Sequence, residues 1–123
     1  MMCGYAKAGR GKRLMRIFLE KGWLEEAAFI GLLYQTPIRA RDVVRLKKSE
    51  IDGRKVHAIE GKFCGNYLDR SGNPYQITRQ LKNLISSIHH KESDMIFTKK
   101  METYLYQCRK YDRTLRLRQL PIT

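Results

Sequence analysis

The feature that most constrains the fold is an apolar stretch between residues 24 and 35, LEEAAFIGLLYQ. Small and apolar residues recur along it at the spacing of one helix face, and further apolar residues widen that face. Leu24, Ala27, Ala28, Gly31 and Leu32 hold these positions, the polar Gln35 continues the spacing, and Trp23, Ile30 and Leu33 lie beside them. We therefore expect a nearly buried helix. A chain of 123 residues with 42% apolar content closes one core, so a single domain is predicted.

The segment before this helix divides into two parts. Residues 1–13, MMCGYAKAGRGKR, combine three glycines and four basic residues with little apolar content, which predicts a flexible basic arm. From residue 14 the spacing becomes helical, with a short stripe of Leu14, Ile17 and Phe18. Gly22 stands where that helix is expected to end. The folded domain is accordingly expected to span residues 14–123.

A third helix is predicted after the apolar stretch. The Thr36 side chain suits an N-cap, and Pro37 suits the first helical position, where its missing N–H costs nothing. The helix is therefore predicted to start at Ile38 and to run through IRARDVVRLKKS. Its core side is expected to carry Ile38, Val43 or Val44, and Leu46, and its exposed side Arg41, Arg45, Lys47 and Lys48.

After residues 52 and 53, Asp-Gly, the apolar pattern changes to alternation. Val56 and Ile59 belong to a short strand, and alternation returns at residues 75–78, which predicts a hairpin or small sheet. The stretch between them is rich in turn residues and is expected to be a long exposed connection. Helical spacing resumes in residues 81–88 and 101–111, with an apolar link at 95–97. The predicted fold class is mainly α with a small β hairpin or sheet (α+β).

The charge of the chain is strongly unbalanced. It carries 25 Lys and Arg against 12 Asp and Glu, a formal net charge of +13. An ordinary soluble surface mixes both signs, so this excess indicates an anionic partner. Nucleic acid is favoured over a membrane because no run of 18 apolar residues and no signal-peptide core are present. A cytoplasmic location is the matching expectation.

The cysteines and histidines do not suggest a metal site or another cofactor. Cys3, Cys64 and Cys108 are an odd number without CxxC spacing, which argues against a disulfide framework and a zinc knuckle. We treat them as reduced thiols. His89 and His90 are adjacent, so their side chains point apart, and no third ligand has a suitable spacing. No metal and no cofactor are expected.

The segment LLYQTPIRARDVVRLKKSEID, followed by GRKVHAIEGK, resembles the opening of the tyrosine recombinase or phage integrase catalytic domain. The family pattern runs roughly L-L-x-x-T-G-L-R-x-x-E-L-x-x-L-x-x-x-D-I-D, and Lys62 matches the lysine of its following hairpin. The chain departs from the pattern at Pro37, where the family prefers Gly, and in a long loop after Lys62. Positions in register are Leu32, Leu33, Thr36, Ile38, Arg39, Asp42, Val43, Val44, Leu46, Ser49, Glu50, Ile51 and Asp52.

The resemblance spans about residues 14–123 and implies a partial tyrosine-recombinase catalytic-domain fold. The family continues after a segment like Leu120 to Thr123 into an H-x-L-R-H motif and a nucleophilic tyrosine, before which this chain ends. We therefore expect a truncated domain that binds DNA without completing strand cleavage. Tyr104, Tyr106 and Tyr111 precede the second arginine's position, so packing or base stacking is expected of them rather than nucleophilic attack.

The resemblance also implies roles for individual residues. In the family reaction a tyrosine attacks a DNA phosphodiester, and fixed cations stabilise the charge that develops on the phosphoryl oxygens. Arg39 matches the first arginine of that clamp, whose planar fork donates two N–H bonds to phosphate. Lys62 matches a general acid that protonates the leaving 5′ oxygen. Arg41, Arg45, Lys47 and Lys48 are expected to contact the DNA backbone.

Two readings of function stay open beside each other. In the first, the chain is a DNA-binding fragment of a site-specific recombinase from a mobile element such as a prophage. Its partner is duplex DNA, and whether it self-associates there stays open. In the second, it is a non-catalytic regulator that binds nucleic acid, and Arg39 is one surface cation among many or pairs with Asp42. A structural ribonucleoprotein subunit is a third reading, which only the charge supports.

Overall fold

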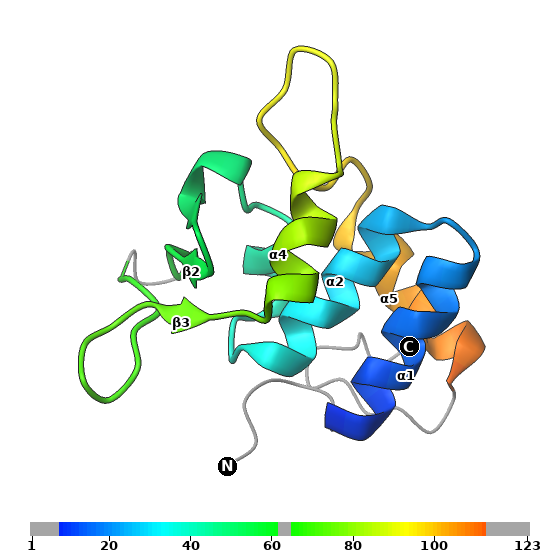
Figure 1. The fold of residues 1–123 in the computed structure, drawn as a ribbon, viewed down its shortest axis with the longest axis horizontal. Helices are drawn as coiled ribbons and strands as arrows, with labels where there is room; N and C mark the ends of the chain where they lie inside the picture. The colour runs from blue at the N-terminus through cyan, green and yellow to red at the C-terminus, as the bar shows by residue number, and fades with distance from the viewer. Residues whose placement is uncertain (1–7, 62–64, 113–123) are drawn as a thin grey trace.

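The computed structural model describes residues 8–61 and 65–112. Within them the chain forms mainly helices, with three short strands between the third and fourth (Figure 1). The predicted class, mainly α with a small β sheet, is confirmed. In chain order the elements are α1 (Ala8–Glu20), α2 (Leu24–Gln35), α3 (Ala40–Val43), a 3-10 turn (Lys48–Glu50), β1 (Ile51–Asp52), β2 (Lys55–Val56), β3 (Tyr75–Gln76), α4 (Arg79–Ser86) and α5 (Met101–Tyr111).

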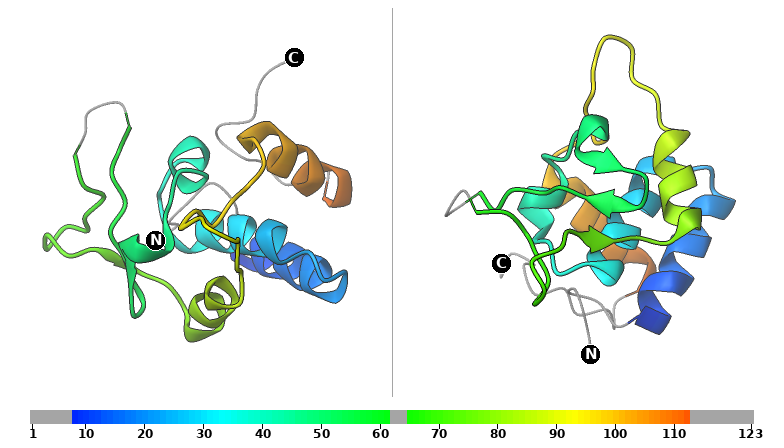
Figure 2. Two further views of the ribbon diagram at one scale, coloured as in Figure 1. Left: turned by 90° about the horizontal axis from the view of Figure 1, so that it is seen from above. Right: turned by 60° about the vertical axis from the view of Figure 1, so that its left-hand side comes forward.

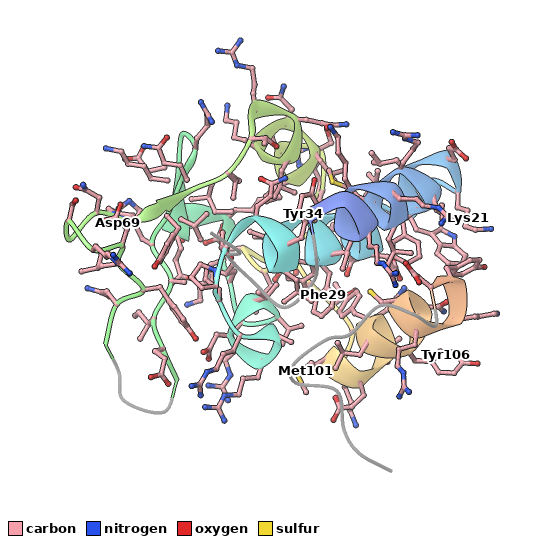
Figure 3. The ribbon with its side chains drawn as sticks, turned by 90° about the horizontal axis from the view of Figure 1, so that it is seen from below. Lys21, Phe29, Tyr34, Asp69, Met101 and Tyr106 are labelled. Atoms are coloured by element: carbon pink, nitrogen blue, oxygen red, sulfur yellow. The ribbon has the colours of Figure 1, made fainter. Side chains whose placement is uncertain are left out.

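Helix α2 is the centre of the domain. It contacts α1, α3, α4 and α5, and Figure 2 shows α4 on one side of it with α3 and α5 on the other. Every residue of α2 from 26 to 33 is buried, as its apolar surface predicts. On the side of α2 that faces α5, Phe29 stacks on Tyr104 with ring centroids 5.0 Å apart (Figure 3). The apolar link also reaches this core, because Phe97 packs edge-on against both rings.

Small residues let the neighbouring helices approach α2 closely. At Gly31 an added Cβ would lie 2.8 Å from a methyl of Leu81 in α4 and 3.3 Å from the sulfur of Met15 in α1. Both helices therefore meet α2 at the same level. Gly11 of α1 lies against Tyr34 near the C-terminal end of α2, where an added Cβ would stand 2.6 Å from the Tyr34 Cβ.

The three strands form one antiparallel sheet in the order β1-β2-β3. Ile51 pairs with Val56, and Val56 in turn pairs with Tyr75. The tight turn between β1 and β2 contains Gly53, whose φ of 61° is a backbone conformation that favours glycine. The predicted small sheet is confirmed by the pairing of β2 with β3, and β1 adds a third strand that the alternation did not predict. The buried Val56 side chain anchors the sheet to the helical core.

Two predicted helix starts are wrong. Helix α1 begins at Ala8, so residues 8–13, predicted as part of a flexible arm, are helical. Contact with Tyr34 through Gly11 gives this weakly apolar segment a packing surface that its composition does not reveal. Residues 1–7 of the predicted arm lie outside the described residues.

The third helix begins at Ala40, not at Ile38, and ends at Val43. The Thr36 hydroxyl does not cap this helix. It donates to the Leu32 carbonyl at 2.7 Å and so closes the end of α2. The residues that follow run extended, which lets Ile38 enter the core as a buried side chain.

A cluster of polar contacts joins the first turn of α2 to residues 90–104. The Glu25 carboxylate accepts hydrogen bonds from the N–H and hydroxyl of Thr98 and from the hydroxyl of Tyr104, and it lies 3.3 Å from His90 Nε2. Burial tends to raise the pKa of Glu25, but the bonds from Tyr104 and Thr98 and the nearby His90 lower it below its ordinary value. Next to it, Lys99 pairs with Glu26 at 2.6 Å.

The remaining described features concern a thiol and the membrane. Cys108 is a free, buried cysteine, and burial raises its pKa to about 12, which keeps the thiol protonated. Cys3 and Cys64 lie outside the described residues. Within residues 8–61 and 65–112, no helix has the length and apolar character needed to cross a membrane.

The contact between α1 and α2 predicts opposite effects for two glycine substitutions. Gly11→Ala should lower the free energy of unfolding by about 1–3 kcal/mol, because the new Cβ would collide with Tyr34. Gly9→Ala meets open space and should raise the free energy of unfolding by up to about 1 kcal/mol through helix propensity. Urea unfolding of the two variants measures both values. Equal effects would contradict the packing described for α1.

The lowered pKa of Glu25 predicts a dependence of stability on pH. A carboxyl with a folded-state pKa below its unfolded value stabilises the protein above the unfolded pKa, and that contribution disappears as pH falls through the folded value. The difference in unfolding free energy between wild type and Glu25→Gln should therefore shrink as pH falls below about 4.5, the ordinary glutamate value. Urea unfolding of both proteins between about pH 6 and 3 tests this expectation. A constant difference would show that the cluster does not act through ionised Glu25.

Candidate functional site

Arg39 lies in the short link between α2 and α3. The closed end of α2 at Thr36 fixes where the link starts, since the Thr36 hydroxyl also accepts the N–H of Ile38 at 3.3 Å. Arg39 itself has extended backbone angles and is the N-cap residue of α3. Its carbonyl accepts the N–H groups of Asp42 and Val43 at 2.8 and 2.9 Å. The backbone of Arg39 is thus held on both sides, while its side chain is half-exposed.

The buried carboxylate of Asp42 joins α3 to the segment that follows β2. Tyr67 donates its hydroxyl proton to Asp42 Oδ2 at 2.6 Å, and the N–H of Gly61 donates to Asp42 Oδ1 at 3.2 Å. The same Tyr67 hydroxyl accepts the backbone N–H of Arg39 at 3.4 Å. We call these four residues the Asp42 cluster. It brings Gly61 and Tyr67, which are distant in sequence, beside Arg39.

The hydrogen bonds of the Asp42 cluster also bear on whether the Arg39 side chain pairs with a carboxylate. Both carboxylate oxygens of Asp42 already accept hydrogen bonds from the segment that follows β2, one from the Gly61 N–H and one from the Tyr67 hydroxyl. Among residues 8–61 and 65–112, no carboxylate forms an ion pair with the Arg39 side chain. A pairing of Arg39 with Asp42, which the sequence allowed, is therefore not found. The guanidinium is available to an external anion.

The second predicted catalytic residue, Lys62, lies outside the described residues. Gly61, which directly precedes it, is described and is bonded to Asp42. The chain therefore passes beside the Asp42 cluster one residue before Lys62.

Two of the four predicted backbone-binding residues lie near this cluster. Arg45 is exposed and lies over Gly61, where a Cβ would stand 2.9 Å from Arg45 Nη1. It also lines a hollow of about 270 Å³ together with Asp42, Leu46, Glu50, Ile59 and Gly61. Arg41 is exposed and lies 4.0 Å from Glu60, a distance at which a surface ion pair contributes little. The structure thus places Arg45 beside the Asp42 cluster and Arg41 beside Glu60.

The other two, Lys47 and Lys48, face a different segment. Lys47 forms a β-bridge with Met95, and the N–H of Lys48 donates to the Asp94 carbonyl at 2.8 Å. Lys48 Nζ lies 3.4 Å from His89 Nδ1. Hydrogen bonds from Ser49, with the charges of Lys47 and Lys48 nearby, lower the pKa of Asp94. The structure therefore groups these lysines with residues 89–95 and not with Arg39.

The tyrosines near the end of the described chain differ in exposure. Tyr104 is fully buried, and burial together with its bond to Glu25 raises its pKa, so its hydroxyl stays protonated. Tyr111 packs on Phe18 and Trp23. Packing roles are thus confirmed for both. Tyr106 is 63% exposed and points outward from α5 (Figure 3). In the described part of the chain, no three His, Cys, Asp or Glu side chains gather where they could hold a metal ion.

The fold, but not the sequence, has a known counterpart. No protein-family model and no curated protein matches the chain. The fold is similar to that of XerA recombinase. Its crystal structure superposes with a TM-score of 0.65 at 16% sequence identity, and the match covers 100% of this chain and 47% of that one. The chain thus spans about half the length of the recombinase, and the predicted recombinase catalytic-domain-like fold is confirmed.

Sequence reasoning missed Tyr67 and Gly61. Both lie in or beside a stretch rich in turn residues, which predicts an exposed connection. A tyrosine hydroxyl that reaches a carboxylate 25 residues earlier leaves no periodic signal in the sequence. Only the return of the hairpin segment toward α3 brings these groups together.

The Asp42 cluster predicts a specific loss of stability. Tyr67→Phe removes the hydroxyl and leaves Asp42 Oδ2 and the Arg39 N–H without their described partner, which should lower the free energy of unfolding by about 1–3 kcal/mol. Tyr106→Phe removes an exposed hydroxyl and should change it by less than about 0.5 kcal/mol. Urea unfolding of the two variants makes the comparison. A Tyr67→Phe protein as stable as wild type would mean that the cluster does not hold the hairpin segment.

Proposed function

We propose that this chain binds the phosphodiester backbone of duplex DNA through Arg39 and acts in DNA recombination or integration as a tyrosine recombinase-like protein. The observation that carries the proposal is the state of the Arg39 side chain. It projects from a rigid link, it is half-exposed, and within the described residues no carboxylate pairs with it. The similarity of fold to XerA recombinase and the net charge of +13 support the same conclusion.

The chemistry of Arg39 suits a phosphate. A guanidinium stays charged at every physiological pH and donates two parallel N–H bonds to phosphate oxygens. Because the link and the Asp42 cluster hold its backbone in place, little further ordering is needed when the anion binds. In strand transfer the same donors would stabilise the charge that develops on the phosphoryl oxygens.

We also propose Lys62 as the general acid for the leaving 5′ oxygen. The support comes from its neighbour Gly61, which is hydrogen-bonded to Asp42, three residues along the chain from Arg39. An ammonium that donates a proton to an alkoxide has to reach the same phosphodiester that the arginine holds.

The other predicted cations would contact the backbone on either side. Arg41 and Arg45 lie around the Asp42 cluster and would bind phosphates next to the one held by Arg39. Lys47 and Lys48 would meet the backbone further away, beside residues 89–95. On this proposal the chain works on cytoplasmic DNA of a prokaryote or a phage-infected host, where self-association on DNA would pair two sites.

The proposal predicts a large effect of one substitution. Arg39→Ala should weaken binding to a duplex by about 10- to 100-fold, because a charge-assisted bidentate contact is lost. The dependence of log Kd on log salt should fall by about 0.9, the value for one phosphate contact. Fluorescence anisotropy with a labelled duplex at several salt concentrations measures both. Arg39→Lys keeps the positive charge but loses the planar guanidinium, so its affinity for the duplex should lie between those of wild type and Arg39→Ala.

Arg109→Ala is the matched control. Arg109 is exposed on α5, so its loss removes one positive charge away from the Asp42 cluster. It should weaken binding no more than about threefold, as expected for general electrostatics. If Arg39→Ala and Arg109→Ala weaken binding equally, Arg39 is one cation among many, and a non-catalytic nucleic-acid-binding regulator becomes the better description.

A further inference from the structure

The outward sides of residues 9–16 in α1 and of α4 carry basic residues without acidic ones, and the one acidic residue of α1 is Glu20 at its far end. Residues 9–16 and residues 79–87 contain no Asp or Glu, although the whole chain has 12. Some basic residues elsewhere on the surface lie beside carboxylates, as Lys99 does beside Glu26. The basic residues of the two segments are Arg10, Lys12, Arg13, Arg16, Arg79 and Lys82. We call this surface the α1–α4 face.

The two helices lie close enough to act as one surface. Met15 of α1 and Leu81 of α4 both reach Gly31, so the helices flank α2 at the same level. The start of α4 is tied to the end of α2, because the N–H of Thr78 donates to Gln35 Oε1 at 2.8 Å. The start of α1 packs on Tyr34 of the same α2 end (Figure 3). The starts of the two helices therefore lie near the same end of α2.

The placement of the cations runs against helix stability. The first turns of a helix carry a partial positive charge that favours acidic side chains and disfavours basic ones. Helix α4 has no acidic residue in its first turn and begins with the exposed Arg79. Charges that disfavour their own helix indicate a role outside folding. Lys12 and Arg16 lie one turn apart, so a single extended anion can contact both.

We propose that the α1–α4 face is a second nucleic-acid contact surface, which binds the phosphodiester backbone of a duplex segment other than the one held at Arg39. This inference rests on the proposed function, because it takes DNA as the partner. In Figure 2, α3, which starts next to Arg39, lies across α2 from α4. A duplex at Arg39 and a second one at the α1–α4 face therefore approach from different sides.

An anionic membrane is a poorer fit to this face. Helices that lie in a membrane surface expose large apolar side chains that enter the lipid. The exposed large apolar side chains of the described residues are Ile59, Leu68 and Tyr106, and none of them is in α1 or α4. The apolar residues Leu14, Met15 and Phe18 of α1 are buried in the core. The face thus offers charge without an insertion surface, which suits a phosphate backbone.

A bridging experiment tests the inference. The 123-residue chain is loaded on an immobilised duplex, unbound protein is washed away, and capture of a second, fluorescent duplex is measured. Wild type should capture it, and the triple variant Lys12→Gln, Arg13→Gln, Arg16→Gln should capture at least about tenfold less. Arg79→Gln with Lys82→Gln, on the neighbouring helix, should reduce capture in the same direction. Melting temperatures near that of wild type verify that these substitutions leave the fold intact.

The matched control is Lys100→Gln, Arg109→Gln, Lys110→Gln. It removes the same charge from exposed positions at and in α5, and capture should stay within about twofold of wild type. Equal capture by the control and the α1 variant overturns the inference, as does a wild-type protein that captures no second duplex. If the α1 variant instead loses binding to phosphatidylserine vesicles and keeps duplex capture, the face binds lipid and the inference is wrong.

The result separates this inference from the proposed function. Failure of the Arg39 site would appear as unchanged affinity of Arg39→Ala for a single duplex. Failure of the α1–α4 face would appear as unchanged capture by the α1 and α4 variants. If Arg39→Ala weakens binding of the first duplex and the α1 variant loses only the second, both stand.

Discussion

The burial of α2 on all sides is the interaction on which the rest of the structure depends. A helix with so little polar surface is stable only when other elements cover it, and here four helices do so. Gly31 lets α1 and α4 approach α2 at one level. Phe29 packs against the rings of Phe97 and Tyr104. Because each of these helices contacts α2 more than it contacts the others, α2 sets the position of the other four helices.

The two ends of α2 serve different purposes. At its start, Glu25 and Glu26 bind Thr98, Lys99 and Tyr104 and so attach the last third of the described chain. At its end, Gln35 holds the start of α4, and Thr36 turns the chain into the extended link that leads to the candidate site. The acidic groups at the start of α2 thus stabilise the fold, whereas the link after the end of α2 carries the cationic Arg39.

That division has an electrostatic consequence. A buried carboxylate next to an arginine usually pairs with it, but Asp42 uses both oxygens to bind Tyr67 and Gly61. Arg39 keeps an uncompensated charge that a phosphate can neutralise. Asp42 therefore helps to position Arg39 without neutralising the charge of its guanidinium. The likeness to XerA recombinase, at 16% identity, lies in the arrangement of helices and strands and not in extensive sequence agreement.

The sequence by itself determined what depends on local spacing. The buried α2, the small sheet that pairs Val56 with Tyr75, the apolar link at 96 and 97 and the fold class all follow from periodicity, and the integrase-like motif singles out Arg39. Only the tertiary structure decided the start of α1, the role of the Thr36 hydroxyl, the separation of Lys47 and Lys48 from Arg39, and the Asp42 cluster. The reason is physical: periodicity records which face of an element is buried, whereas a contact between residues 23 or 25 positions apart depends on how the elements pack.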